Sequence, residues 1–431
     1  MIDTELKKKL NIAVIGGGGR EHAIIRAIKM SPLAGKIYAL PGNGGISESA
    51  ECVPVSATDL DGIVKFCTEN PVDFAAVIPD DPLAMGLVDL LEEKGIPCFG
   101  PRKNAAIIES SKAFSKELMK KYGIPTARYE TFTELEPALR CVREHALPVV
   151  IKADGLALGK GVIIAETAKE AEAAVRSMMV DEKFGKSGKT VVIEEFLTGP
   201  EVSVLAFTDG KTIVPMPASM DHKRALDGDA GLNTGGMGVI APNPFYTKEL
   251  AERTMNEIIL PTVDAMNKEN RTFRGCLYFG LMMTPDGPKV IEYNCRFGDP
   301  ETQAVLPLLK SDFVKIMLAT RSGTLADCEV RFSDEASCCL ILASGGYPEK
   351  YEKGKPIEFD DMPKDILVFH AGTKKTDAGL VTSGGRVLGL TALGNDLEEA
   401  VSAAYEAAEH VEFEKMYYRN DIGARALAAI K

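Results

Sequence analysis

The stretch Asn11-Ile-Ala-Val-Ile15 runs directly into Gly16-Gly-Gly-Gly19 and then into a helical sequence. The first hundred residues repeat this order, with apolar strands predicted over 36–40 and 73–78 and helices over 21–29, 60–68 and 83–94. Apolar strands that alternate with helices predict a parallel, doubly wound α/β sheet. Ligands of such a sheet bind at the carboxyl ends of its strands, where the glycine-rich turns 16–19 and 41–45 lie.

The first glycine turn lacks the spacing of a dinucleotide-binding fingerprint. That fingerprint needs a third glycine three residues after the second, and Glu21 or His22 stands there instead. No acidic residue ends the second predicted strand, where one would hold a ribose. A loop that holds an anion or a substrate is therefore favoured over a nicotinamide site, and a plain tight turn is the alternative.

The composition is that of an ordinary globular protein. The chain has 431 residues, 45% apolar and 26% charged, which is enough for roughly three domains. Its net charge of −12 argues against a nucleic-acid partner. No apolar run reaches about 18 residues and the first ten lack an apolar signal core, so we expect no membrane partner. Nine cysteines without CxxC spacing fit reduced thiols in the cytoplasm.

Helix signals and composition divide the chain into three predicted domains. The first, residues 1–111, holds the alternating strands, and a helix from Ser111 to Tyr122 opens the second, residues 112–334. Within the second, residues 127–193 form a smaller α/β unit with the capping box Thr167-Ala-Lys-Glu170. The third, residues 335–431, is a small α/β domain with a second capping box, Asn395-Asp-Leu-Glu398.

Two lysines frame a loop of small residues, Lys152-Ala-Asp-Gly-Leu-Ala-Leu-Gly-Lys160. Such a loop can close on a polyphosphate without steric cost. It is not a Walker loop, because it is one residue too short and lacks the hydroxyl after its lysine. Taken alone, it is equally well a glycine-rich hairpin.

A strand and a turn are predicted at Val191-Val-Ile-Glu194-Glu195-Phe196-Leu197. The backbone at the end of such a strand can offer a carbonyl and an N–H group to the edge of an adenine, and Glu201 can reach ribose hydroxyls. Acidic residues beside a strand are more often simply solvated, so this pattern alone is weak.

The strongest local signal is Glu292-Tyr-Asn294-Cys-Arg296-Phe-Gly-Asp-Pro-Glu-Thr-Gln303. Glu292 and Asn294 lie two apart on a predicted strand and share one face. Their oxygens suit Mg²⁺, which binds a few carboxylates together with phosphate oxygens. Arg296, on the same face, can clamp a carboxylate or a phosphate. The alternative is a structural ladder of ion pairs. The polar, glycine-rich stretch 219–238 is either a set of surface turns or a functional loop.

Together and in this order, these segments resemble the phosphoribosylamine–glycine ligase family of the ATP-grasp superfamily. The resemblance covers essentially the whole chain and rests on Gly19-Arg-Glu-His-Ala23, Pro41-Gly-Asn-Gly-Gly45, Ser111-Lys-Ala-Phe114, the Lys152 loop, Asp221-His-Lys-Arg224, Asn233-Thr-Gly-Gly-Met-Gly238, Arg296-Phe-Gly-Asp-Pro-Glu-Thr-Gln303, His370-Ala-Gly-Thr-Lys374 and Gly384-Gly-Arg386. It implies an α/β fold with an N-terminal substrate domain, a two-part ATP-grasp domain and a small C-terminal domain. The part formed by 127–193 is expected to be mobile.

The resemblance also implies a reaction and its partners. ATP, glycine and 5-phosphoribosylamine would give glycinamide ribonucleotide, ADP and phosphate through a glycyl phosphate, in the second step of de novo purine synthesis. Mg²⁺, or Mn²⁺ in its place, is the expected cofactor. The family suggests a monomer in the cytoplasm.

Residue roles are carried over from the same resemblance. ATP is expected to contact Lys112, Lys152, Gly159, Lys160, Glu194, Glu195, Phe196, Leu197 and Glu201. The metal is expected at Glu292 and Asn294, and the catalytic residues are Arg296, Asp221, Lys223 and Asp299. The other substrates are expected to contact Gly18, Arg20, Asn43, Gly44, Arg224, Asn233, Lys374, Gly385 and Arg386.

Three positions depart from the family pattern. Gly280 stands near the place where many ATP-grasp ligases carry a further metal-binding Asp. Asp80 replaces a Glu that is one methylene longer, and Leu232 replaces a common Pro. The alternative functions are another ATP-grasp carboxylate–amine ligase or carboxylase and a non-catalytic nucleotide- or dinucleotide-binding protein.

Overall fold

The computed structural model describes residues 9–156, 161–181 and 185–430. Its N-terminal part contains the predicted parallel sheet, with five strands in the order β3-β2-β1-β4-β5. The central strands are buried on both faces, which is why they read as unbroken apolar runs. The strands are β1 (Leu10–Gly16), β2 (Ala34–Pro41), β3 (Glu51–Cys52), β4 (Phe74–Val77) and β5 (Cys98–Phe99).

Helices flank this sheet, and one predicted helix is wrong. They are α1 (Gly19–Lys29), α2 (Leu60–Glu69), α3 (Asp80–Met85), α4 (Leu87–Glu93) and α5 (Lys103–Ser110). The single helix predicted over 83–94 is in fact α3 and α4. Gly86 separates them at φ +100°, a left-handed conformation that ends a helix and that glycine adopts without strain.

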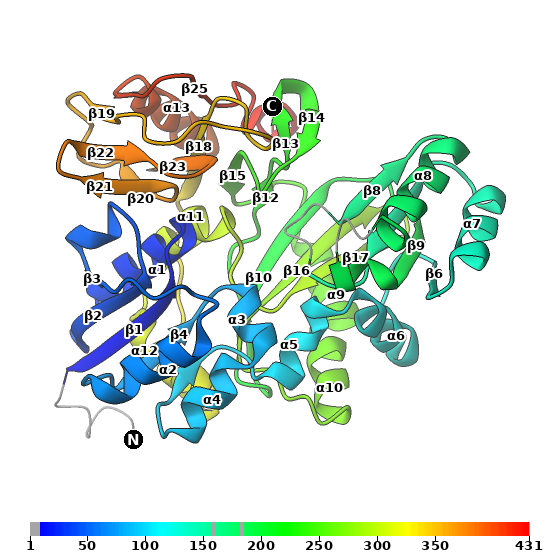
Figure 1. The fold of residues 1–431 in the computed structure, drawn as a ribbon, viewed down its shortest axis with the longest axis horizontal. Helices are drawn as coiled ribbons and strands as arrows, with labels where there is room; N and C mark the ends of the chain where they lie inside the picture. The colour runs from blue at the N-terminus through cyan, green and yellow to red at the C-terminus, as the bar shows by residue number, and fades with distance from the viewer. Residues whose placement is uncertain (1–8, 157–160, 182–184, 431) are drawn as a thin grey trace.

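A small lobe carries the second sheet, in the order β6-β9-β7-β8. Its elements are β6 (Tyr129–Phe132), α7 (Leu135–Glu144), β7 (Val149–Ala153), β8 (Val162–Ala165), α8 (Ala168–Met179) and β9 (Val191–Glu195). As predicted, Thr167 caps α8 by accepting from the N–H of Glu170 at 3.2 Å. The lobe has its own apolar core and stands apart from the N- and C-terminal parts (Figure 1). Helix α6 (Lys112–Tyr122), capped by Ser111 and ended by Gly123, leads into it.

The third sheet is antiparallel and holds the strand with the strongest sequence signal. Its order is β11-β10-β16-β17. The strands are β10 (Glu201–Thr208), β11 (Ile213–Pro215), β16 (Gly275–Thr284) and β17 (Gly287–Asn294). The helices between residues 248 and 322 are α9 (Lys248–Thr254), α10 (Leu260–Lys268), α11 (Glu301–Val305) and α12 (Phe313–Ser322), with a π-helical turn at Met255–Ile259.

The C-terminal sheet takes strands from two predicted domains. Its order is β12-β15-β18-β23-β20, with β25 also paired to β18. The strands are β12 (Met220–Asp221), β15 (Gly238–Ala241), β18 (Ala336–Ser344), β20 (Leu367–His370), β23 (Arg386–Gly394) and β25 (Met416–Tyr417). Because β12 and β15 come from residues before 335, the predicted boundary between 334 and 335 runs through a continuous sheet.

Short ribbons and two helices complete the C-terminal part. The ribbons are β13 (Arg224–Leu226) with β14 (Ala230–Asn233), β19 (Glu358–Phe359) with β24 (Val411–Glu412), and β21 (Thr373–Thr376) with β22 (Gly379–Thr382). The helices are α13 (Leu397–Ala408) and α14 (Ala424–Ile430). The second capping box is one residue later than predicted, because Asp396 rather than Asn395 accepts from the N–H of Glu399, at 2.9 Å.

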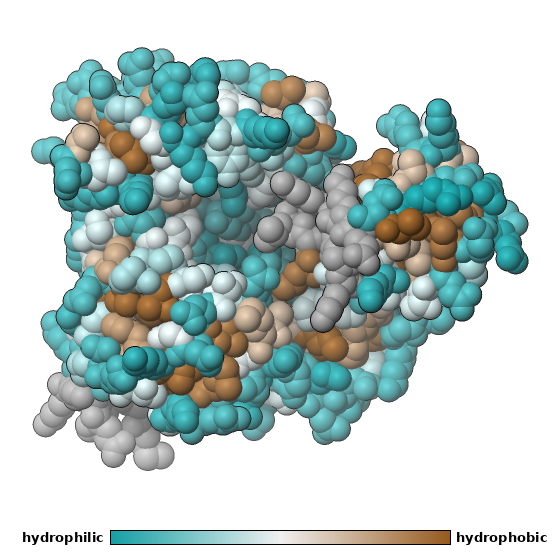
Figure 2. All heavy atoms as spheres, viewed as in Figure 1, coloured by the Kyte–Doolittle hydropathy of each residue, from teal (hydrophilic) through white to brown (hydrophobic). Residues whose placement is uncertain are grey.

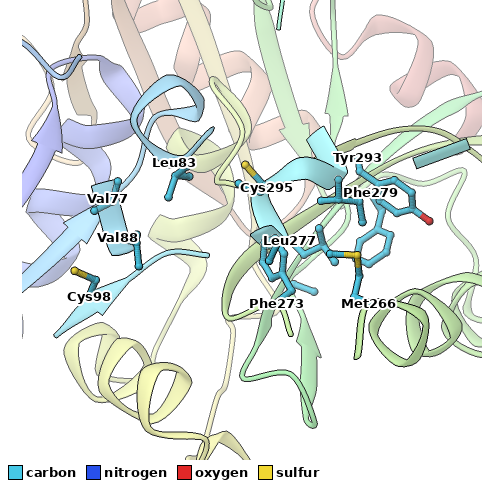
Figure 3. Close-up of a cluster of buried hydrophobic side chains, with 14 of the residues drawn as sticks. Val77, Leu83, Val88, Cys98, Met266, Phe273, Leu277, Phe279, Tyr293 and Cys295 are labelled. Atoms are coloured by element: carbon cyan, nitrogen blue, oxygen red, sulfur yellow. The ribbon is translucent and has the colours of Figure 1, made fainter. Parts of the chain in front are cut away.

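One apolar core joins the N-terminal part to the third sheet. Val77, Leu83 and Val88 of the N-terminal part belong to the same buried cluster as Leu277 and Phe279 of β16, as Figure 3 shows. Such a shared core fixes the two parts against each other. Within the described residues, no helix combines the length and the apolar character needed to cross a bilayer.

Candidate active site

A cavity of about 930 Å³ lies where the three parts of the chain meet. Its walls include Arg20 and Asp80 from the N-terminal part, Lys152 and Glu292 from the two middle sheets, and Arg386 from the C-terminal sheet. Figure 2 shows that this face of the molecule is hollowed between the parts and that the visible floor of the hollow is hydrophilic. The cavity therefore combines charged groups that lie far apart in the sequence.

A buried carboxylate and two lysines form the inner end of the part of the cavity where the sequence predicts ATP. Glu194, at the end of β9, is 2% exposed, and its Oε2 accepts from Nζ of Lys152 and of Lys116, both at 3.0 Å. Lys152 also donates to the carbonyl of Ile291 at 2.8 Å. Lys116 also donates to the hydroxyl of Thr126 at 2.8 Å. The other Glu194 oxygen, Oε1, is buried and has no hydrogen-bond partner in the part of the chain that the structure describes.

The other predicted ATP residues surround this group. Lys112 donates to the carbonyl of Gly155 at 2.9 Å, and burial and the nearby Lys152 charge lower its pKa. The cavity wall continues along Glu195, Phe196, Leu197 and Glu201. Glu195 is held by Arg128, whose side chain lies 2.8 Å from Oε2 and whose backbone N–H donates to Oε1 at 3.0 Å. Gly159 and Lys160 lie outside the described residues.

The two predicted metal ligands both line the cavity. Lys223 lies 3.3 Å from Oε1 of Glu292 and 3.0 Å from Oε2 of Glu201, and its charge, more than any other cause, lowers the pKa of Glu292. Asn294 Oδ1 accepts from Arg296 at 3.3 Å. In the described part of the chain, no three His, Cys, Asp or Glu side chains gather into a ready metal cluster. An ionised carboxylate and one amide oxygen fit a Mg²⁺ ion whose other ligands are phosphate oxygens and water.

Gly280 lies directly across the sheet from Glu292, at the position suspected from the sequence. A Cβ atom at Gly280 would lie 2.6 Å from Cγ of Glu292. No side chain can therefore stand there unless Glu292 moves. The absence of a further Asp at this point is tied to the close approach of the Glu292 side chain.

Arg296 is held by a carboxylate that the sequence did not point to. Its Nη2 lies 3.0 Å from Oε1 of Glu109, whose Oε2 accepts from the N–H of Cys295 at 2.8 Å. Burial opposes the charge on Arg296, but Glu109 and Asp80 outweigh it and raise its pKa. Its Nε is buried and has no acceptor within the described ranges, so one donor is left for a ligand.

Asp221 and Asp299 have different surroundings. Asp221 Oδ1 is buried without a partner, and burial followed by the Glu301 charge raises the pKa of Asp221 well above its usual value. Asp299 accepts from Gln303 at 2.7 Å and lies 3.4 Å from Arg386. Arg386 also donates to the carbonyls of Asp299 and Gly235 at 2.8 and 2.7 Å, so it joins three segments.

The predicted substrate residues fall into two groups. Arg20, Arg224, Asn233 and Arg386 line the cavity. The others lie outside this lining. The Gly18 N–H donates to Glu21, and the Asn43 amide donates to the carbonyls of Gly17 and His370. The Gly44 N–H donates to the Thr373 carbonyl, the Gly385 carbonyl accepts from the Ser344 N–H, and Lys374 lies on β21. A substrate role for this second group stays a prediction.

Sequence reasoning missed Lys116, Glu109 and Glu301 as site residues. Lys116 follows Lys112 by four residues on one helix, so the two share a face, and this spacing was a usable signal. Glu301 lies inside the strongest motif and accepts from the Ser203 hydroxyl at 3.3 Å. Nothing around Glu109 distinguishes it from an exposed helix residue. Asp80 does line the cavity, and although burial favours its neutral form, Arg296 and Arg20 lower its pKa overall.

Comparison with known proteins agrees with this geometry. Three consecutive models of phosphoribosylglycinamide synthetase match the chain: the N domain over 10–109, the ATP-grasp (A) domain over 110–302 and the C domain over 337–425. A phosphoribosylamine–glycine ligase from Halalkalibacterium halodurans is 48% identical over 97% of this chain and 98% of its own length. The chain belongs to the phosphoribosylglycinamide synthetase family. The predicted family and the predicted ATP-grasp α/β fold are thus confirmed.

Other relatives extend the comparison. A phosphoribosylamine–glycine ligase from Haemophilus influenzae is 48% identical over 97% of this chain and 99% of its own. A crystal structure of the ligase from Thermotoga maritima has a TM-score of 0.85 at 36% identity and covers 96% of this chain and 100% of its own. A biotin carboxylase domain from Hydrogenobacter thermophilus, in complex with MgADP and bicarbonate, shares the fold at 20% identity, with a TM-score of 0.75 over 95% of this chain and 92% of its own.

Proposed function

We propose that this chain is a phosphoribosylamine–glycine ligase of purine biosynthesis, which uses ATP to join glycine to 5-phosphoribosylamine. The observation that carries the proposal is the single cavity that receives Lys152 and Glu292 from the ATP-grasp part, Arg20 and Asp80 from the N-terminal part, and Arg386 from the C-terminal part. Such a cavity can bring a triphosphate and a second anionic substrate together at one place. Family membership supports the same reaction.

In the first step, a carboxylate oxygen of glycine attacks the γ-phosphorus of ATP. A new P–O bond forms, the bond to the β-phosphate breaks, and ADP leaves. Phosphoryl transfer of this kind needs positioning and neutralisation of charge rather than a protein nucleophile. Lys112 and Lys152 supply charge on the nucleotide side, and Arg296, with its unpartnered Nε, is suited to the glycine carboxylate and the acyl phosphate formed from it.

In the second step, the amine of phosphoribosylamine attacks the acyl carbon of the glycyl phosphate. The C–N bond forms, the C–O bond to phosphate breaks, and the nitrogen loses one proton. Asp221 and Asp299 are proposed to orient this amine. The raised pKa of Asp221 follows from burial beside Glu301, and a carboxylate of that kind can accept the released proton.

Glu292 and Asn294 are proposed to hold Mg²⁺ or Mn²⁺, with Lys223 neutralising the carboxylates before the metal arrives. The metal, when bound, neutralises charge on the phosphate oxygens. Glu194 and the backbone of Phe196 and Leu197 are proposed to bind adenine, and Glu201 the ribose. We further propose that the enzyme is a cytoplasmic monomer, which light scattering on the purified chain can test.

The test is the release of ADP from ATP and Mg²⁺, with glycine and freshly generated phosphoribosylamine added singly and together. ADP that forms only when both are present supports the proposal. Arg296→Met should abolish this turnover, whereas Arg143→Met removes a surface ion pair with Glu172 and should leave it unchanged. ADP formed with other carboxylates or amines, or no ADP at all, would overturn the proposed substrates.

A further inference from the structure

Lys116 is a buried cation whose only direct anionic partner among the described residues is Glu194. Its side chain is 3% exposed, and its Nζ lies 3.0 Å from Glu194 Oε2 and 2.8 Å from the Thr126 hydroxyl. Thr126 in turn donates to the carbonyl of Val290 at 2.7 Å, which fixes the hydroxyl as an acceptor for Lys116. The ammonium also lies 5.5 Å from the centre of the Tyr129 ring. Contacts with Glu194, Thr126 and Tyr129 thus hold Lys116 in one position.

Both lysines at Glu194 contact the same oxygen. Lys116 and Lys152 each approach Oε2 to 3.0 Å, whereas Oε1 is buried and has no hydrogen-bond partner among the described residues. A buried carboxylate oxygen without a partner is costly in an isolated protein, so a donor from a ligand is the natural partner. Oε1 belongs to a cavity residue at the end of β9, beside Phe196 and Leu197.

We propose that Lys116 is a positioning residue that locks Glu194 with Oε1 toward the nucleobase, and so sets the preference for a 6-amino purine over a 6-oxo purine. The inference rests on the proposed function in one respect, the placement of the nucleobase beside Glu194. An ionised carboxylate oxygen can only accept hydrogen bonds. It pairs with an exocyclic amino group, whereas a 6-oxo group would face it with a second acceptor.

The surroundings of Lys116 explain why the orientation of the Glu194 carboxylate depends on this lysine. Burial lowers the pKa of Lys116 to about 8, against the opposing pull of Glu194. Lys152 and Lys116 hold Glu194 Oε2 from different elements, because Lys152 is also bound to the Ile291 carbonyl and Lys116 to the Thr126 hydroxyl. Without Lys116, Oε2 would lose one of its two partners and the carboxylate could rotate toward Lys152 alone. A site built around one hydrogen bond discriminates strongly only while its acceptor is fixed.

The test compares the binding of ATP and ITP by calorimetry, with no glycine or phosphoribosylamine present. The parent chain should bind ATP at least tenfold more tightly than ITP. Lys116→Met should weaken ATP binding by about tenfold and ITP binding much less. In a separate steady-state assay with all substrates present, kcat should change far less than the KM for ATP. The matched control is Lys120→Met on the same helix, because Lys120 is exposed and lies 6.0 Å from the same Tyr129 ring; it should change neither nucleotide.

A second variant keeps the inference open to refutation if Lys116→Met does not fold. Glu194→Gln supplies an amide that can donate to a 6-oxo group, so the ratio of ATP to ITP affinity should fall at least tenfold. Equal weakening of both nucleotides by Lys116→Met, or an unchanged ratio in Glu194→Gln, would overturn the inference while leaving the ligase proposal intact. A parent chain that binds neither nucleotide would overturn both.

Discussion

The backbone N–H of His370 donates a hydrogen bond of 2.9 Å to Nδ1 of His22. The bond ties β20 of the C-terminal sheet to α1 of the N-terminal part, beside the cavity residue Arg20. It also requires that Nδ1 carry no proton, so the His22 ring is neutral when the two parts are joined. Burial, then the proximity of His370 and Arg26, lowers the pKa of His22 to about 3, and burial lowers that of His370 to about 4.

We therefore expect acid to destabilise the protein below about pH 6.5. Between the ordinary histidine pKa and about 3, the unfolded chain binds a proton at His22 that the folded chain excludes, so the free energy of unfolding falls as the pH falls. For His22 the loss should reach about 3 kcal/mol at pH 4.5. Urea unfolding at pH 7, 5.5 and 4.5 measures it, and His22→Gln should flatten the profile.

The control for this profile is His145→Gln. His145 shares a hydrogen bond with the adjacent carbonyl of Ala146, and within the described ranges this bond links no two parts of the chain. Its variant should follow the parent at every pH. A His22→Gln profile parallel to that of the parent would show that this histidine does not carry the acid sensitivity.

Glu292→Gln should lower kcat at least a hundredfold at saturating ATP and Mg²⁺. The amide keeps the shape of the side chain but removes the charge that holds the metal, and a hundredfold loss corresponds to about 2.7 kcal/mol of transition-state stabilisation. The thermal midpoint should stay close to that of the parent. Glu257→Gln, which loses only a surface pair with Arg253, serves as the control. Normal turnover in Glu292→Gln would exclude Glu292 as the metal ligand.

Gly280→Ala should displace the Glu292 side chain from the neighbouring strand, β16. A Cβ 2.6 Å from Cγ of Glu292 must displace that side chain, and overpacking of this kind costs about 1–3 kcal/mol. We expect lower stability in urea and a higher Mg²⁺ concentration for half-maximal activity. The double variant Gly280→Ala with Glu292→Ala removes Cγ at position 292, makes room for the new methyl group and should regain part of the lost stability. If the two effects simply add, the steric explanation fails.

Arg386→Ala should raise the KM for phosphoribosylamine more than the KM for ATP. Arg386 binds the backbone at Gly235, Gly236 and Asp299 and lies 3.4 Å from the Asp299 carboxylate, which is proposed to orient the amine. The variant leaves three carbonyls without this donor, so stability should also fall by about 1–3 kcal/mol. Steady-state kinetics with each substrate varied in turn separate the two constants. An equal rise in both would remove Arg386 from the phosphoribosylamine site.

Local signals in the sequence predicted the ends of several helices. Ser111 and Gly123 delimit α6, and Thr167 caps α8, because each acts through bonds within its own turn. The same signals failed where two adjacent residues could both cap a helix, and where a glycine stands inside an apolar helical pattern. Asp396 rather than Asn395 caps α13, and Gly86 divides an apolar helical pattern that looked continuous. The cap of α13 lies one residue from the prediction, whereas Gly86 interrupts the predicted helix in its interior; both depend on backbone angles that composition does not encode.

The candidate site was predicted best where one short motif supplies several groups. Glu292, Asn294 and Arg296 come from a single strand and the turn after it, so their spacing alone put them together. Lys116 and Glu109 come from separate helices and approach their partners only after folding. The stretch 219–238 could be read as turns because β12 pairs with β15, and β15 finds its other neighbour, β18, almost a hundred residues further along the chain.

The mixed origin of the C-terminal sheet has a consequence for the order of events on the ribosome. Asp221 ends β12, which is held by β15, and β15 in turn needs β18 beside it. Until Ala336–Ser344 has left the exit tunnel, the wall that carries Asp221 has no neighbour to close against. The strands of the small lobe can thus pair before β18 has been made, whereas the cavity wall that carries Asp221 is completed only after residues 336–344 have been added.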